Sequence, residues 1–146
     1  MIIKSYEINK INFDLNNLLL FYGKNEGLKN EVIKNIIKNK NNVLNYEEKE
    51  VLDNEDNFIE NIFTKSLFDN EKIIIVKRST DKILRIIENL NSKKLEDITV
   101  IINAENLEKK SKLRSFFEKE KKIICVPFYP DNNQTLSKLT YNFLKR

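Results

Sequence analysis

The residues from Gly23 to Asn30 occupy the position that a phosphate-binding loop takes in many nucleotide-binding proteins. Gly23 follows an apolar run and precedes a helical pattern, and at such a junction backbone N–H groups and a helix N-terminus face an anion. The P-loop pattern is G-x4-G-K-[ST]. Counted from Gly23, its last three positions fall on Leu28, Lys29 and Asn30, so that only the lysine matches.

The mismatches remove the parts of the loop that hold a nucleotide and its metal. Leu28 places a side chain where the loop needs bare backbone, and Asn30 lacks the hydroxyl that binds Mg²⁺. The third apolar run ends in Lys77-Arg78, so the acid that would hold the metal is missing as well. We therefore expect Gly23, Lys29 and Asn30 to form a degenerate loop that does not bind ATP. A divergent nucleotide-binding enzyme stays as an alternative.

Composition excludes several other kinds of chemistry. The 146 residues include no histidine, which excludes Ser-His-Asp sites, Cys-His sites and every His-ligated metal site. Cys125 is the one cysteine, so a disulfide within the chain and a cysteine-based zinc site are both excluded. With 40% hydrophobic and 33% charged residues, the chain has the composition of a folded globular domain. We expect no metal and no cofactor.

Leu67 and Phe68 form an adjacent pair of large apolar side chains after a helical pattern. At about 100° per residue, the apolar residues of 58–63 share one face of a helix, and a continued helix would turn Phe68 to roughly the opposite face. Exposed pairs of this kind are typical anchors for a hydrophobic pocket on a partner. The alternative is that the helix ends at Ser66 and both side chains fold back into the core.

Charge is distributed unevenly along a chain whose net charge is +4. The stretch 47–60 holds seven acids and one lysine, whereas 109–122 holds seven bases and two acids. The basic stretch offers candidate contacts for DNA phosphates or an acidic partner at Lys109, Lys110, Lys112 and Arg114. A solvated helix face is the simpler interpretation. A basic DNA-binding module that works alone is a second alternative for the whole chain.

The elements that position these residues follow from alternating apolar runs and helical patterns. Buried strands are predicted at 18–22, 72–77, 98–102 and 123–126, and strand signals around 43–52 are weak. Helices are predicted at 28–37, 58–63, 83–90 after a Ser79 or Thr80 cap, 107–120 and 134–146. This alternation predicts a three-layer α/β (αβα) domain with a mostly parallel sheet of about five strands.

Four segments, in a consistent order, resemble the N-terminal region of the delta subunit of the bacterial DNA polymerase III clamp loader. They are LLLFYGKNEG (Leu18–Gly27), TKSLFDNEKIIIVK (Thr64–Lys77), ITVIINAENLEKKSK (Ile98–Lys112) and FYPDNNQTLSKL (Phe128–Leu139). The most specific piece is Ser66-Leu67-Phe68 followed by an aliphatic strand. The resemblance implies an AAA+-like (P-loop NTPase-like) domain that has lost its ATP site.

The resemblance also implies a function in DNA replication. A delta subunit binds the ring-shaped sliding clamp (beta) and helps open the ring, by inserting a Leu-Phe pair into a hydrophobic pocket of the clamp. That pair falls on Leu67 and Phe68, with Ser66 before them. Such a subunit is a non-catalytic part of a DNA polymerase holoenzyme, and ATP hydrolysis belongs to other subunits of the loader. The further partners implied for the full-length protein are gamma/tau and delta prime, with DNA contacted indirectly or weakly.

The resemblance divides the chain into a clamp-binding domain, 1–130, and the start of a helical lid domain, 131–146. Because the rest of the lid and a C-terminal collar domain are missing, we expect the chain to be a fragment of a longer protein. Its first residues do not form a signal peptide, and its longest apolar run, 18–22, is too short to span a bilayer. We expect a cytoplasmic protein.

Overall fold

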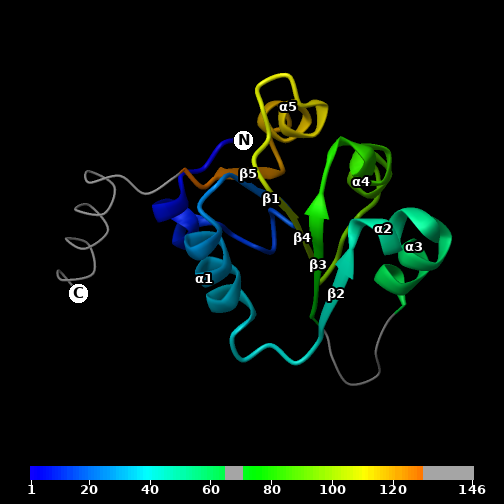
Figure 1. The fold of residues 1–146 in the computed structure, drawn as a ribbon. Coiled ribbons are helices and arrows are strands. Elements are labelled where there is room, and N and C mark those ends of the chain that lie inside the picture. Colours follow the sequence, from blue (N-terminus) through cyan, green and yellow to red (C-terminus); the bar gives the residue numbers. More distant parts are fainter. Residues whose placement is uncertain (65–70, 130–146) are drawn as a thin grey trace.

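A five-stranded parallel sheet forms the centre of the molecule. The structure is a computed structural model, and it describes residues 1–64 and 71–129. The strand order is β2-β3-β4-β1-β5 (Figure 1), and every neighbouring pair is parallel. The strands are β1 (Leu18–Tyr22), β2 (Val43–Glu47), β3 (Lys72–Ser79), β4 (Ile98–Ala104) and β5 (Ile124–Pro127). The predicted α/β fold with a parallel sheet is therefore confirmed.

Helices cover both faces of the sheet and complete the three layers (Figure 1). One face packs against α1 (Glu26–Ile37) and the 3-10 helix η1 (Ser5–Lys10). The other face packs against α2 (Glu48–Asp53), α3 (Glu55–Phe63), α4 (Leu84–Asn91), which follows the short η2 (Asp81–Ile83), and α5 (Lys112–Lys119).

The central strand β1 shows why the apolar runs are continuous. Its side chains alternate between the two faces, since Leu18, Leu20 and Tyr22 join the core beneath α3, α4 and α5, whereas Leu19 and Phe21 join the core beneath α1. All five residues are buried because both faces are covered. Each face therefore demands apolar side chains, and an unbroken apolar run results.

The predicted helix at 107–120 is too long at its start, because α5 begins only at Lys112. The Asp81 carboxylate accepts hydrogen bonds from the Ser111 hydroxyl at 2.5 Å and from the Lys112 and Leu113 amides at 3.2 Å. Burial by itself would raise the pKa of Asp81, but these hydrogen bonds outweigh it and hold the pKa below its ordinary value. The carboxylate, at the start of η2, thus fixes the first turn of α5.

The two edges of the sheet are the parts that the sequence indicates least clearly. Strand β2, where the signals are weak, is partly exposed along its whole length because only β3 flanks it. At the opposite edge, the N-terminal segment forms a bridge from Ile2 to Cys125 of β5, beyond the predicted strands. Pro127 is tolerated as the last residue of β5 because this strand lies at the edge of the five-stranded sheet.

The predicted lid segment, 131–146, lies outside the described residues, as does the Ser66–Phe68 segment. Within 1–64 and 71–129, none of the helices has the length and apolar character needed to cross a membrane.

Candidate functional site

Gly23 makes the turn from β1 to α1 possible. Its φ is +128°, and a Cβ at this position would lie 2.0 Å from the carbonyl oxygen of Phe128. The Gly23 N–H donates to the Glu105 carbonyl at 2.8 Å, and the Asn25 N–H donates to the Phe128 carbonyl at 3.3 Å. The turn is thus attached to the segments that follow β4 and β5, and two of its backbone donors point at protein carbonyls.

Lys29, the one residue that matches the P-loop pattern, is completely buried. Its ammonium donates to the Ala104 carbonyl at 2.5 Å and to the Gly23 carbonyl at 3.4 Å, and it forms an ion pair with Glu26 at 2.6 Å. The lysine of a working loop instead reaches the β- and γ-phosphates. Here the ammonium holds the ends of β1 and β4 together.

The first turn of α1 also binds its own cap. The Asn25 side chain accepts from the Leu28 N–H at 3.1 Å, and the Asn25 carbonyl accepts from the Lys29 N–H at 3.1 Å. Asn30, the third residue of the predicted degenerate loop, lies exposed on α1. The donors that a phosphate would use at a helix N-terminus are therefore engaged within the protein at these positions.

The end of β3 is basic, as the sequence shows. Lys77 and Arg78 are exposed there, and Arg78 has a φ of +55° at a register shift between β3 and β4. Its guanidinium lies 3.6 Å from the Glu47 carboxylate. Strand β4 lies between β3 and β1, so this basic end of β3 is one strand away from the Gly23 turn.

Helix α3 ends at Phe63, before the Ser66–Phe68 segment begins. Thr64 has extended backbone angles, and its N–H and hydroxyl both donate to the Glu60 carbonyl, at 3.0 Å and 2.8 Å. Phe58 and Ile62 are buried, which confirms the predicted apolar face of this helix. Because Thr64 caps α3, the helix neither continues through Leu67 nor ends as late as Ser66. The positions of the Leu67 and Phe68 side chains lie outside the described residues.

The basic residues near α5 are brought into one region but have different surroundings. Three lysines lie exposed in the turn before α5 and at its start: Lys109, Lys110 and Lys112. Arg114 instead stacks on the Tyr22 ring, with 5.0 Å between the guanidinium carbon and the ring centroid. Its side chain also donates to the Leu107 carbonyl at 3.0 Å and pairs with Glu118 at 3.2 Å. Arg114 therefore supports the packing of α5 on β1.

Cys125 lies in the middle of the sheet edge formed by β5 and is fully buried. Burial raises the pKa of its thiol to about 12. At neutral pH the group is a thiol, and the thiolate is the form that acts as a nucleophile. Cys125 is a small core residue in this fold.

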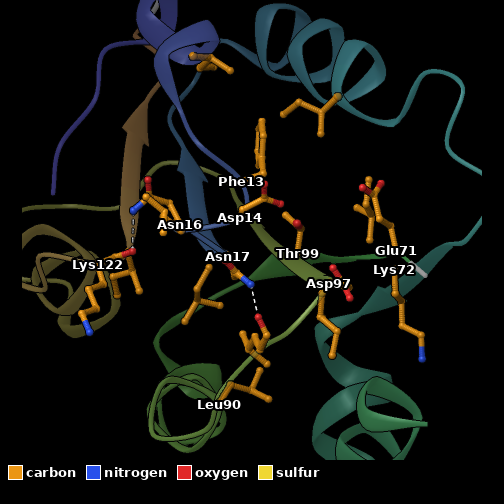
Figure 2. A pocket seen from close by; sticks show the side chains of 18 of the residues that line it. Phe13, Asp14, Asn16, Asn17, Glu71, Lys72, Leu90, Asp97, Thr99 and Lys122 are labelled. Carbon is orange, nitrogen blue, oxygen red and sulfur yellow. Dashed lines mark hydrogen bonds between the residues drawn. The ribbon is translucent and has the colours of Figure 1, made fainter. Parts of the chain in front are cut away.

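An open pocket of about 1650 Å³ lies at the amino ends of the strands, and α1 lines one side of it. Figure 2 shows side chains that surround this pocket. Its lining mixes apolar side chains such as Phe13 with acids, lysines and amides. The Asn16 amide donates to the Lys122 carbonyl at 2.9 Å, and the Asn17 amide donates to the Leu95 carbonyl (Figure 2). These amides tie neighbouring loops together. No motif in the sequence pointed to this pocket, since its residues come from seven separate segments.

Comparison with known proteins identifies a structural relative. No family model matches the sequence, and no curated protein is similar to it in sequence. Among solved structures, the chain is similar to the Bacillus subtilis DNA clamp loader delta protein (YqeN), with a TM-score of 0.71 and 17% sequence identity. This chain shares its fold with that protein. The similarity covers 96% of this chain and 45% of the delta protein, so the chain spans less than half of its length.

Proposed function

We propose that this chain is the clamp-binding domain of a clamp-loader delta subunit that acts in DNA replication. It binds the sliding clamp, helps open the ring, and does not hydrolyse ATP. The observation that carries the proposal is the shared fold with the Bacillus subtilis delta protein over 96% of the chain. The four resembling segments of the sequence support it, because they point to the same subunit independently of the backbone.

The contacts around Lys29 support a role without nucleotide. A bound phosphate needs free backbone donors and a lysine that reaches it. In this chain the Lys29 ammonium binds the Ala104 and Gly23 carbonyls, and the Gly23 N–H binds the Glu105 carbonyl. ATP would have to break these contacts before it could enter, so the degenerate loop serves as a structural joint.

Clamp binding is assigned to Leu67 and Phe68, preceded by Ser66, on the basis of the sequence resemblance. Burial of a large apolar side chain contributes roughly 1.5–3 kcal/mol, so the two anchors together supply about 3–6 kcal/mol toward binding. A ligand shifts a closed ring toward the open form only if it binds the open form more tightly. Ring opening by this domain therefore requires an anchor pocket whose shape or accessibility differs between the two forms of the clamp.

A calorimetric titration of the 146-residue chain into the sliding clamp of the same organism tests the proposal. We expect saturable binding to the clamp. Two parallel measurements address the alternatives, namely the Tm of the chain with and without Mg²⁺-ATP and the binding of duplex DNA at low and high salt. We expect an unchanged Tm and no strong DNA binding.

Each of the other outcomes contradicts the proposal in a different way. A clear rise in Tm with ATP would indicate a divergent nucleotide-binding enzyme, because a ligand that binds the native state stabilises it. Duplex binding that falls steeply with salt, without clamp binding, would indicate a DNA-binding module. A folded chain that binds none of the three would remove the clamp-loader interpretation.

A further inference from the structure

The N-terminus of the chain, at Met1, lies between α5 and β5 (Figure 1). The ammonium group there donates to three main-chain carbonyls, those of Phe117 at 2.8 Å, Glu120 at 2.7 Å and Ile123 at 2.9 Å. Phe117 lies in the last turn of α5, Glu120 is the C-cap of that helix, and Ile123 directly precedes β5. All three N–H groups of one ammonium are thus used.

These contacts cap the C-terminal end of α5. The last four carbonyls of a helix have no partner within it, and this end of a helix carries partial negative charge. A cation with three donors satisfies both needs, as basic side chains do at the C-terminal ends of other helices. The Met1 ammonium therefore stabilises the end of α5 and the turn that leads from it into β5.

Met1 also begins a short segment that lies along the outer edge of β5. The Cys125 N–H donates to the Met1 carbonyl at 2.9 Å, and the Ile3 N–H donates to the Cys125 carbonyl at 2.9 Å. The Met1 and Ile2 side chains are 43% and 54% exposed, so burial of apolar surface holds these two residues only weakly. The segment is therefore attached mainly by its hydrogen bonds and by Ile3, which packs against the core.

We infer that the Met1 nitrogen is a modification-sensitive site, and that an acyl group on it, such as formyl or acetyl, releases the end of α5 and the N-terminal segment. Acyl transfer from an activated donor, such as a thioester, forms an amide bond between this nitrogen and the acyl carbon. The leaving group takes one proton of the ammonium, and a second proton goes to solvent. The amide nitrogen keeps one N–H, so it can donate to one carbonyl instead of three.

This contrast does not depend on the charge state of the amine. Partial burial lowers the pKa of the Met1 amine, and the nearby Glu118 and Glu120 carboxylates act in the opposite direction. A neutral amine still keeps two N–H groups, whereas the acylated nitrogen keeps one. An acyl group also adds atoms to a nitrogen whose three acceptors lie within 2.9 Å of it. Acylation therefore weakens the cap more than the loss of a proton does.

The test compares four forms of the 146-residue chain. The first has a free Met1 amine, and the second carries a formyl group on that nitrogen, obtained by bacterial expression with the deformylase inhibited and verified by mass spectrometry. The third is extended by Gly-Ser before Met1, which also turns the nitrogen into an amide. The fourth, Lys4→Gln, is the control, because it removes a positive charge from an exposed residue of the same segment and leaves the Met1 amine free.

We expect the formylated and the extended chains to melt about 5 °C below the chain with the free amine, because carbonyls at the end of α5 lose their donors. The Lys4→Gln chain should melt within about 1 °C of the free chain. We also expect the Ile3 and Cys125 amides to exchange with solvent about tenfold faster in both modified chains, since both amides take part in the contacts of the released segment. Their exchange in Lys4→Gln should be unchanged.

Two results would overturn the inference. If either modified chain melts and exchanges as the free chain does, the Met1 ammonium is not the cap that holds α5. If Lys4→Gln shows the same losses, the effect comes from the charge of the segment and not from the nitrogen. A modified chain that does not fold, beside a folded Lys4→Gln chain, would support the inference. None of these measurements uses the clamp, so their outcome is independent of the proposed function.

Discussion

Replacing Leu67 and Phe68 together by alanine should weaken binding to the sliding clamp by more than about 2 kcal/mol, the scale of an interface hot spot. Two large apolar side chains that enter a pocket on the clamp would supply most of the affinity of this domain. Their loss removes that buried area and leaves the pocket of the clamp empty. Calorimetric titration of the double variant beside the unmodified chain measures the difference.

A matched control removes apolar surface elsewhere. Tyr6 and Leu15 are 55% and 73% exposed, and neither belongs to the segments that resemble a delta subunit. A Tyr6→Ala/Leu15→Ala variant should bind the clamp as the unmodified chain does. If the Leu67/Phe68 variant binds as tightly as the unmodified chain, the clamp is still the partner, but Leu67 and Phe68 are not the binding site. If both double variants lose the same amount of clamp affinity, binding depends on nonspecific hydrophobic contact.

Lys29→Met is expected to lower the free energy of unfolding by about 2 kcal/mol, because the buried Ala104 and Gly23 carbonyls would lose a charged donor. Methionine fills nearly the same space, so the loss reflects the hydrogen bonds more than the packing. Urea unfolding measures this change as a lower midpoint with an unchanged slope. If Lys29 instead belonged to a working phosphate loop, Lys29→Met would change the free energy of unfolding of the ligand-free chain only slightly.

Lys34→Met provides the control for this substitution. Lys34 lies on the same helix, α1, but is exposed, and exposed substitutions of this kind usually change stability by less than about 0.5 kcal/mol. If Lys29→Met and Lys34→Met unfold at the same urea concentration, Lys29 is not a structural joint. In that case the ammonium would be available for a ligand, and nucleotide binding would need to be considered again.

The sheet could be predicted because its central strands are covered on both faces. A strand such as β1 or the middle of β3 then appears as an unbroken run of large apolar residues, a signal that needs no distant information. Strand β2 gave a weaker signal because it lies at an edge and remains partly exposed. The strength of each prediction thus followed the burial of the strand.

The details that decide function depended on distant residues and could not be predicted. The sequence shows a lysine at position 29. The direction of its side chain, however, is set by a hydrogen bond to the Ala104 carbonyl, which lies 75 positions away along the chain. Similarly, α5 begins late because Asp81 binds its first turn. Arg114 belonged to a basic stretch that looked solvated, and its contact with the Tyr22 ring arises only from tertiary packing.

Hydrogen exchange of the chain with and without saturating clamp is the sharpest test of clamp binding, because it detects the partner and also locates the surface that the partner covers. We expect slower exchange in the peptides that span residues 60–72, and unchanged exchange around Gly23–Lys29 and around Lys109–Arg114. Slower exchange confined to either of those two regions would place the contact elsewhere. Unchanged exchange along the whole chain would contradict clamp binding itself.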